Sequence, residues 1–257
     1  MIKRGIIVWL LACTVLADEL EFRKECRLTH GVKSVACVWG DFIWQLIDID
    51  TLFVLGLATP VYVTTRFLDK DIHRLFYCPD HHCNINQMPK WCYYTAKVGV
   101  PIELVALSFL GLSSRYDLAK TGQVFAFTLP ITWAIKKGLK QIKSEVCRRP
   151  LNQFFNPNKK YYNGCPSGHA FETVYAATYF TLREGWQAGL PLWAFAAAVS
   201  GELIACNRHF TSQIVAGGAL GVAAGIAADK VAKRWIYTGS ACDFSVSGNS
   251  IKCSWSY

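Results

Sequence analysis

Six long apolar segments limit what this chain can fold into more than any other feature of its sequence. They recur near residues 51–66, 95–113, 120–135, 169–182, 187–206 and 213–230, and charged residues, proline or glycine separate them. Each segment is long enough for a helix of several turns. The sequence therefore predicts an all-α fold in which residues 51–235 form one bundle of about six core helices.

The length and charge of the apolar segments do not decide whether this bundle lies in a membrane or in water. The uncharged runs are about 15 to 17 residues long, at or below the length that crosses a bilayer. Ionisable residues interrupt several of them, namely Lys97, Glu103, Glu172 and Glu202. The mean hydropathy of +0.21 lies between the values typical of soluble helical proteins and of multi-span membrane proteins. A compact membrane bundle and an exported soluble bundle both fit.

The N-terminus has the pattern of a secretory signal. Lys3 and Arg4 form a positive region, an apolar stretch follows at 5–16, and Ala17 ends a small-residue cleavage site. We expect a signal peptide over residues 1–17, since the apolar stretch is short for an uncleaved anchor. Residues 18–50 are then a mixed, polar N-terminal segment that leads into the core.

Cysteine usage also indicates export. Ten of the eleven cysteines lie beyond residue 17, an even number suited to disulfides in an oxidising compartment. They are Cys26, Cys37, Cys78, Cys83, Cys92, Cys147, Cys165, Cys206, Cys242 and Cys253. The stretch 78–83 lacks the second ligand pair of a zinc site, so we expect a loop staple and no metal. The tail, 236–257, is expected to be a small stapled hairpin or an extended arm.

A net charge of +9 favours anionic partners, such as phosphorylated substrates or anionic lipid surfaces. A basic surface that serves only solubility is the alternative. The lysines and arginines are scattered and do not form basic runs with stacking aromatic residues, so nucleic acid is not an expected partner.

The most specific motif is Pro166-Ser167-Gly168-His169, directly before the apolar segment 169–182. Proline ends any preceding helix, and Ser167 stands where a helix N-cap belongs. Gly168 leaves the backbone open, so the first amides of the helix can point at an anion such as a phosphoryl group. The alternative is an ordinary capped helix with a surface histidine.

Two further elements fit the same chemistry. Arg149 lies before a proline at a helix end, where its guanidinium can hold two phosphate oxygens, and Lys140 or Lys143 can add a second cation. His209 follows the fifth apolar segment beside Arg208, and a neutral imidazole can attack phosphorus. Taken singly, a solvated basic helix end and a structural histidine are the ordinary interpretations.

Together and in this order, the motifs resemble those of the type 2 phosphatidic acid phosphatase superfamily, which also contains class A acid phosphatases, undecaprenyl-pyrophosphate phosphatases and vanadium haloperoxidases. The family pattern is Lys-x6-Arg-Pro, then Pro-Ser-Gly-His, then Ser-Arg-x5-His-x3-Asp, on a bundle of about six helices. The resemblance covers roughly residues 50–232 and includes Ala216-Gly217-Gly218 after the last histidine.

The resemblance implies an exported phosphatase without metal or cofactor. His209 would be the nucleophile that forms a phosphohistidine, and His169 would protonate the leaving group. Arg149, Ser167 and Gly168 would bind the phosphoryl oxygens. The expected substrate is a phosphomonoester or pyrophosphate, favoured as a lipid by the apolar helices, with the protein periplasmic or in a membrane with its site on the exported side. The oligomeric state stays open.

The cations depart from the family pattern at two places. The position of the family's lysine is Ile142, with Lys143 one residue too close to Arg149 and Lys140 two residues too far; we choose Lys143. The position of the family's arginine, six residues before the nucleophile, is a leucine, and Arg208 is the proposed substitute. Vanadate-dependent halide oxidation is disfavoured, because those relatives keep the full ligand set.

Gln213 stands where the family has the aspartate that orients the nucleophile. Its carbonyl can accept the imidazole N–H of His209 but cannot stabilise imidazolium character, so we expect lower turnover. Glu202, two helical turns before His209, would lie about 10 Å away along a straight helix, too far to replace the aspartate. A family member that binds phosphate or anionic lipid without efficient turnover is the alternative.

Overall fold

The structure of the protein is a computed structural model, and it describes residues 28–76, 94–150, 162–205, 208–238, 243–247 and 250–254. The predicted signal peptide at 1–17 and the cysteine-containing stretch at 78–83 lie outside the described residues. Both therefore stay predictions.

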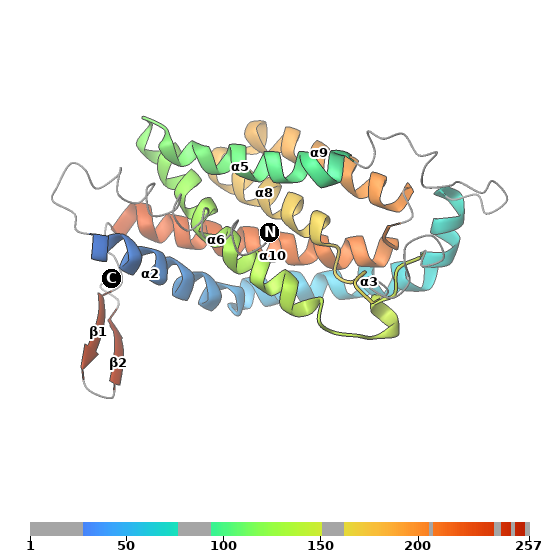
Figure 1. Ribbon diagram of the computed structural model, residues 1–257, viewed down its shortest axis with the longest axis horizontal. Coiled ribbons are helices and arrows are strands. Elements are labelled where there is room, and N and C mark those ends of the chain that lie inside the picture. Colours follow the sequence, from blue (N-terminus) through green and yellow to red (C-terminus); the bar gives the residue numbers. More distant parts are fainter. Residues whose placement is uncertain are drawn as a thin grey trace.

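Helices account for nearly all of the described chain (Figure 1). The α-helices are α2 (Leu28–Leu46), α3 (Ile49–Phe76), α5 (Val100–Phe109), α6 (Tyr116–Leu139), α8 (Gly168–Glu184), α9 (Trp186–Ala205) and α10 (Thr211–Thr238). Short turns of other helix types are η2 (Thr95–Gly99), η3 (Leu110–Leu112) and η4 (Glu145–Cys147). All six apolar segments lie in helices, which confirms the all-α prediction, and α2 adds a seventh α-helix within the described ranges.

Helix α2 was not expected in the polar N-terminal segment. Its apolar residues follow helical spacing, with Val35, Val38, Phe42 and Leu46 packed in or against the core. The indole nitrogen of Trp39 donates a hydrogen bond to the backbone oxygen of Phe127 on α6, at 2.7 Å. The composition of residues 18–50 hid this pattern, because polar Asp41 and Gln45 are buried in α2 while apolar Ile43 and Trp44 are exposed.

Helix α8 is the central helix and lies between α10 and the pair α5 and α9 in Figure 1. Small residues on α10 let the two helices approach closely: a Cβ atom at Gly221 would lie 2.8 Å from the backbone oxygen of Phe171. Against α6, the rings of Tyr175 and Phe125 stack at 5.1 Å between centroids. The hydroxyl of Tyr179 donates to the backbone oxygen of Thr121 at 2.9 Å. This rigid core holds the N-terminal end of α8 in place.

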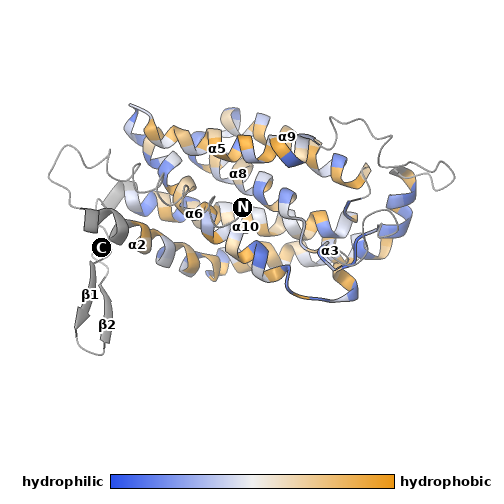
Figure 2. Cartoon of the chain, viewed as in Figure 1, coloured by the Kyte–Doolittle hydropathy of each residue, from blue (hydrophilic) through white to orange (hydrophobic). Residues whose placement is uncertain are grey.

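Four helices are long and apolar enough to cross a membrane: Ile49–Leu75, Thr95–Leu112, Trp186–Ala205 and Thr211–Trp235. Only 6% of the apolar window of Ile49–Leu75 is buried inside the protein, so large side chains such as Phe53 and Phe67 lie on its surface. Many of the residues on the outer helices are apolar, with polar residues between them (Figure 2). Large exposed apolar side chains on long apolar helices favour the membrane bundle over the soluble one.

The C-terminal tail forms a hairpin of two antiparallel strands, β1 (Asp243–Ser247) and β2 (Ser250–Ser254). Of the two forms that the sequence allowed, a hairpin or an extended arm, the structure has the hairpin. Phe244 pairs with Cys253 across it. Cys242 lies outside the described residues, so the stapling disulfide stays a prediction.

The cysteine prediction is not met at the positions whose side chains are described. In the structure the sulfur atoms of Cys37, Cys147 and Cys165 are not bonded to another cysteine. For Cys37 this corrects the sequence-based expectation: its side chain is 4% exposed, and it lies in the hydrophobic core on α2. A buried cysteine of this kind packs as a small apolar residue.

Candidate functional site

Four chain segments meet at one end of the bundle: the C-terminal end of α6, the loop around η4, the N-terminus of α8 and the N-terminus of α10. Glycines permit this meeting. A Cβ atom at Gly217 on α10 would lie 2.4 Å from the backbone oxygen of Ser167, and one at Gly168 would lie 2.7 Å from the Lys136 side chain. The Ser167 amide also donates to the backbone oxygen of Gln213 at 3.0 Å.

The N-terminus of α8 is built as the motif predicts, with one difference. Ser167 is the N-cap residue, but its side chain makes no capping hydrogen bond. Its hydroxyl oxygen is buried and has no hydrogen-bond partner among the described residues. A buried hydroxyl without a partner is costly, so this oxygen is available to a ligand. Ser167 and Gly168 therefore line an anion site at a helix N-terminus.

Cationic side chains surround His169. Burial, and after it the positive charges of Arg208, Lys136, Lys140 and Arg149, lower the pKa of its imidazole to about 3. Lys136 forms an ion pair with Glu172 on the next turn of α8. So many cations around one histidine make a strongly positive pocket that favours a dianion.

Arg149 and Lys140 are held inside this pocket. The Nε and Nη2 atoms of Arg149 donate to the backbone oxygen of Asn163, at 3.3 and 3.1 Å. Burial and then Arg208 lower the pKa of Arg149 to about 10. Burial, followed by Arg149 and Lys136, lowers the pKa of Lys140 to about 8. Both pKa values are lowered because the two side chains are partly removed from water and lie near other cations.

The structure corrects the choice of lysine. Lys143 is exposed, beyond the end of α6. The Nζ atom of Lys140 instead lies 3.2 Å from the position that a Cβ atom of Gly168 would take. Spacing counted along the sequence misled us, because the chain leaves the α-helix after Leu139 and turns before η4. Lys140 and Lys136 are the lysines at the pocket.

His209 lies on the other side of the same pocket, between α9 and α10. Its side chain is 1% exposed. Burial holds its pKa well below the ordinary value, and Arg149, Lys140 and His169 lower it further. The two histidines are 40 residues apart in sequence, and the charges of Arg149 and Lys140 act on both of them. Neutral imidazole is the form that can act as a nucleophile.

Gln213 fixes the ring of His209. Its Oε1 atom lies 3.2 Å from Nδ1 of His209 and accepts a hydrogen bond from the Phe210 amide at 3.3 Å. Its Nε2 atom donates to the backbone oxygens of Arg148, at 2.7 Å, and of Val146, at 3.4 Å. The Nε2 atom of Gln213 donates to two carbonyls, so the atom of Gln213 that faces His209 is the acceptor Oε1. His209 must therefore carry its proton on Nδ1, and Nε2 of His209 keeps a lone pair.

This arrangement explains why an amide can occupy the position of the family's aspartate. An aspartate would be acceptor-only and would leave the carbonyls of the η4 loop without a donor. Gly164 makes room for the amide, since a Cβ atom there would lie 2.7 Å from both Gln213 terminal atoms. Gln213 thus links His209 to the η4 loop, a role that the motif alone does not indicate.

Leu203 cannot supply the missing cation. It is fully buried and packs in an apolar cluster with Ala96, Val100 and Val199. Its backbone oxygen accepts hydrogen bonds from the amides of Arg208 and His209, at 2.9 and 3.2 Å. The connection after α9 therefore turns Arg208 towards the pocket, where its charge acts on His169.

Sequence reasoning missed Asp69, a buried carboxylate on α3. It accepts hydrogen bonds from the amide and the hydroxyl of Ser212, at 2.9 and 2.5 Å, and from Arg66 at 3.1 Å. Ser212 lies in the first turn of α10, between His209 and Gln213. No signal near the histidine motif could have revealed this contact, because 143 residues separate the two side chains.

Comparison with protein families agrees with this geometry. Residues 139–237, from the last residue of α6 into α10, match the model of the PAP2 superfamily. This segment belongs to the PAP2 superfamily. The PAP2 region contains the η4 loop, the Pro-Ser-Gly-His motif and His209, and membership indicates phosphatase-type activity. Comparison with curated proteins and with solved structures gives no match.

Proposed function

We propose that the protein is a metal-independent phosphatase that forms a phosphohistidine at His209. The observation that carries this proposal is a pair of neutral imidazoles, His209 buried and His169 partly buried, near four cations at the N-terminus of α8. Lys140, Arg149, Arg208 and the Ser167-Gly168 backbone bind the phosphoryl oxygens, and Lys136 adds charge from its ion pair.

In the first step, the Nε2 atom of His209 attacks phosphorus in line with the ester oxygen. A P–N bond forms, the P–O bond breaks, and His169 gives its proton to the leaving oxygen. Water then attacks the phosphohistidine, passes a proton to His169, and phosphate departs as the P–N bond breaks. Gln213 holds His209 in the tautomer that the attack needs.

His169 reaches its acid form only with substrate. In the empty pocket, burial and the surrounding cations keep its pKa at about 3. A bound phosphoryl dianion offsets that positive charge and so raises the pKa. Protonation of the acid is thereby coupled to the arrival of a phosphate ester, and the unoccupied site keeps both histidines neutral.

The apolar outer helices favour a lipid phosphomonoester or pyrophosphate as substrate. The pocket lies at one end of a bundle with four helices long enough to cross a membrane, so a phosphorylated headgroup could reach it while its chain stays in the bilayer. We place the pocket on the exported side, as the predicted signal peptide and the cysteines indicate.

A second function rests on Leu203 and Gln213. A chain that lacks one family arginine and the orienting aspartate could bind phosphate or anionic lipid without efficient turnover. A labelled phosphate ester followed by acid-free quenching separates the two functions. A trapped phosphohistidine supports the enzyme, and retained phosphate binding without a phosphoenzyme supports the binding protein.

Steady-state assays test the enzyme. Protein in detergent is given p-nitrophenyl phosphate, phosphatidic acid and a polyprenyl pyrophosphate, with His209→Ala and His169→Ala compared with the parent chain. We expect each variant to lose about 1000-fold or more in kcat. Unchanged activity in both variants would refute the mechanism.

A further inference from the structure

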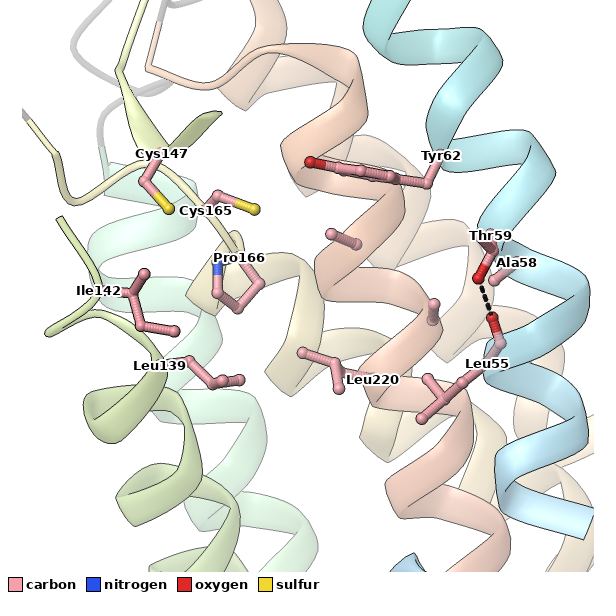
Figure 3. A pocket seen from close by; sticks show the side chains of 12 residues that line it. Leu55, Ala58, Thr59, Tyr62, Leu139, Ile142, Cys147, Cys165, Pro166 and Leu220 are labelled. Carbon is pink, nitrogen blue, oxygen red and sulfur yellow. Dashed lines mark hydrogen bonds between the residues drawn. The ribbon is translucent and has the colours of Figure 1, made fainter. Parts of the chain in front are cut away.

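The two loops that carry phosphate ligands touch behind the pocket. The Gly164 amide donates to the backbone oxygen of Cys147 at 2.8 Å, so the η4 loop and the segment before α8 lie side by side. Each loop has a cysteine two residues before its ligand: Cys147 before Arg149, and Cys165 before Ser167. In Figure 3 the two side chains lie next to each other, above Pro166.

The surroundings of this cysteine pair are apolar and form an open cavity. Both cysteines line a cavity of about 360 Å³ between α3, the end of α6 and α10, opposite the ring of Tyr62 (Figure 3). Cys147 is 7% exposed and Cys165 is partly exposed. The Cys147 thiol and the Tyr62 hydroxyl are both near enough to the Cys165 thiol to affect its pKa. A disulfide requires Cα atoms about 4.4–6.8 Å apart, a spacing that two touching loops can supply.

We propose that Cys147 and Cys165 are joined by a disulfide bond in the native protein, which cross-links the loop of Arg149 to the loop of Ser167. The pair gives up two protons and two electrons to a low-molecular-weight disulfide such as oxidised glutathione, which becomes two thiols. One cysteine attacks that disulfide and releases one thiol; the other cysteine then attacks the mixed disulfide and releases the second.

The bond forms during folding rather than afterwards. Burial, and then the neighbouring Cys147, raise the pKa of the Cys165 thiol to about 11 in the folded protein. Thiolate is the reactive form, so the packed pair exchanges slowly with thiols or disulfides in solution. Before the loops pack, both cysteines have ordinary thiol chemistry. The cross-link is therefore a lasting brace of the phosphate site in an oxidising compartment.

A lasting brace has two measurable effects. The bond closes a loop over residues 147–165, and closing a loop of this size in the unfolded chain stabilises the folded state; we expect Tm to fall by about 5 °C on reduction. It also fixes Arg149 relative to Ser167, so loss of the bond should weaken the binding of inorganic phosphate by about 3-fold to 10-fold.

Peptide mapping tests the bond directly. Full-length protein exported to an oxidising compartment is extracted in detergent without reductant, denatured, alkylated with N-ethylmaleimide and digested. We expect one cross-linked peptide pair that contains Cys147 and Cys165. Alkylation of both cysteines, or a bond from either one to a different cysteine, overturns the proposal. This result does not depend on catalysis, so it is separate from the fate of the proposed function.

Serine variants give an independent measurement. Cys147→Ser and Cys165→Ser should each lower Tm and weaken phosphate binding, and reductant should have a smaller effect on them than on the parent chain. Cys37→Ser is the matched control, a buried cysteine in α2 whose loss should leave the cross-link and the reductant effect in place. A reductant effect of equal size in the Cys147 variant and the parent chain contradicts the proposal.

Discussion

At the scale of single residues, the assignment of the pocket lysine is the sharpest point to test. Lys140 is partly buried beside Gly168, whereas Lys143 is exposed only three residues later. A buried cation that contacts phosphate is worth far more than an exposed one. We expect Lys140→Ala to lower kcat/KM by about 100-fold and Lys143→Ala to change it by less than about 2-fold. Equal losses in both variants would contradict the choice of Lys140 over Lys143 as the lysine that contacts phosphate.

Gln213 gives a second residue-scale prediction. In the parent chain, Nε2 of Gln213 donates to the carbonyls of Val146 and Arg148. Gln213→Glu is nearly isosteric, but it places a carboxylate oxygen against these two carbonyls and removes the donor. We expect a loss of about 2–3 kcal/mol in the free energy of unfolding and no gain in turnover, although the variant restores an acidic group. Gln141→Glu, at an exposed glutamine on the same side of the bundle, should be neutral. Urea unfolding measures both; a more active Gln213→Glu enzyme would contradict the amide's role.

The cations around His169 predict proton uptake on anion binding. Its pKa is held at about 3 in the empty pocket, and a bound dianion raises it. Between these two pKa values the free site is neutral and the occupied site is protonated, so anion affinity rises as pH falls through that window. Sulfate is a suitable probe because it does not titrate there. Calorimetry in buffers of different ionisation enthalpy should record uptake of about one proton at pH 5–6, and His169→Ala should abolish it.

At the scale of helices, α3 fastens the N-terminus of α10. The Asp69 carboxylate satisfies an amide of the first turn of α10 and complements the helix dipole there. The ring of His73 meets that of Phe210 edge-on at 5.6 Å, so a second residue of α3 touches the same turn. A helix outside the PAP2 region thus positions the turn that carries the nucleophile.

Asp69→Asn tests this fastening. The amide keeps the shape but replaces one acceptor oxygen with a donor that faces Ser212, so we expect a loss of about 1–3 kcal/mol in stability and a lower kcat with an unchanged KM. Asp71→Asn, 70% exposed on the same helix, is the matched control and should change neither. If Asp69→Asn loses stability but keeps the kcat of the parent chain, Asp69 stabilises the fold and does not position His209.

The elements show what the sequence could and could not predict. Hydrophobic periodicity located all six apolar helices, because burial in a bundle requires it, and the Pro-Ser-Gly-His motif predicted the start of α8. The placement of Lys140 beside Gly168, the link from Gln213 to the η4 loop and the contact of Asp69 escaped for a common reason. All three depend on where the chain turns after α6 and on contacts between distant segments, which no local pattern records.

At the scale of the whole molecule, the apolar exterior sets the pocket in relation to a membrane. The exposed apolar residues run along α3 and onto α5 and α9, while the cations of the pocket gather at one end of the bundle. A bundle with this division can hold its outer helices in lipid and keep the phosphoryl chemistry at the level of the headgroups.

Arginine substitutions along α3 distinguish lipid from water outside this helix. Leu57 and Leu75 are 58% and 83% exposed, so in water Leu57→Arg and Leu75→Arg would both be nearly neutral. In a bilayer, an arginine at Leu57, inside the span, costs up to about 3 kcal/mol, whereas one at Leu75 reaches the interface. We therefore expect Leu57→Arg alone to reduce the carbonate-resistant fraction of the protein in membranes. Equal, full carbonate release of the parent chain and both variants would mean that no part of the bundle spans the bilayer.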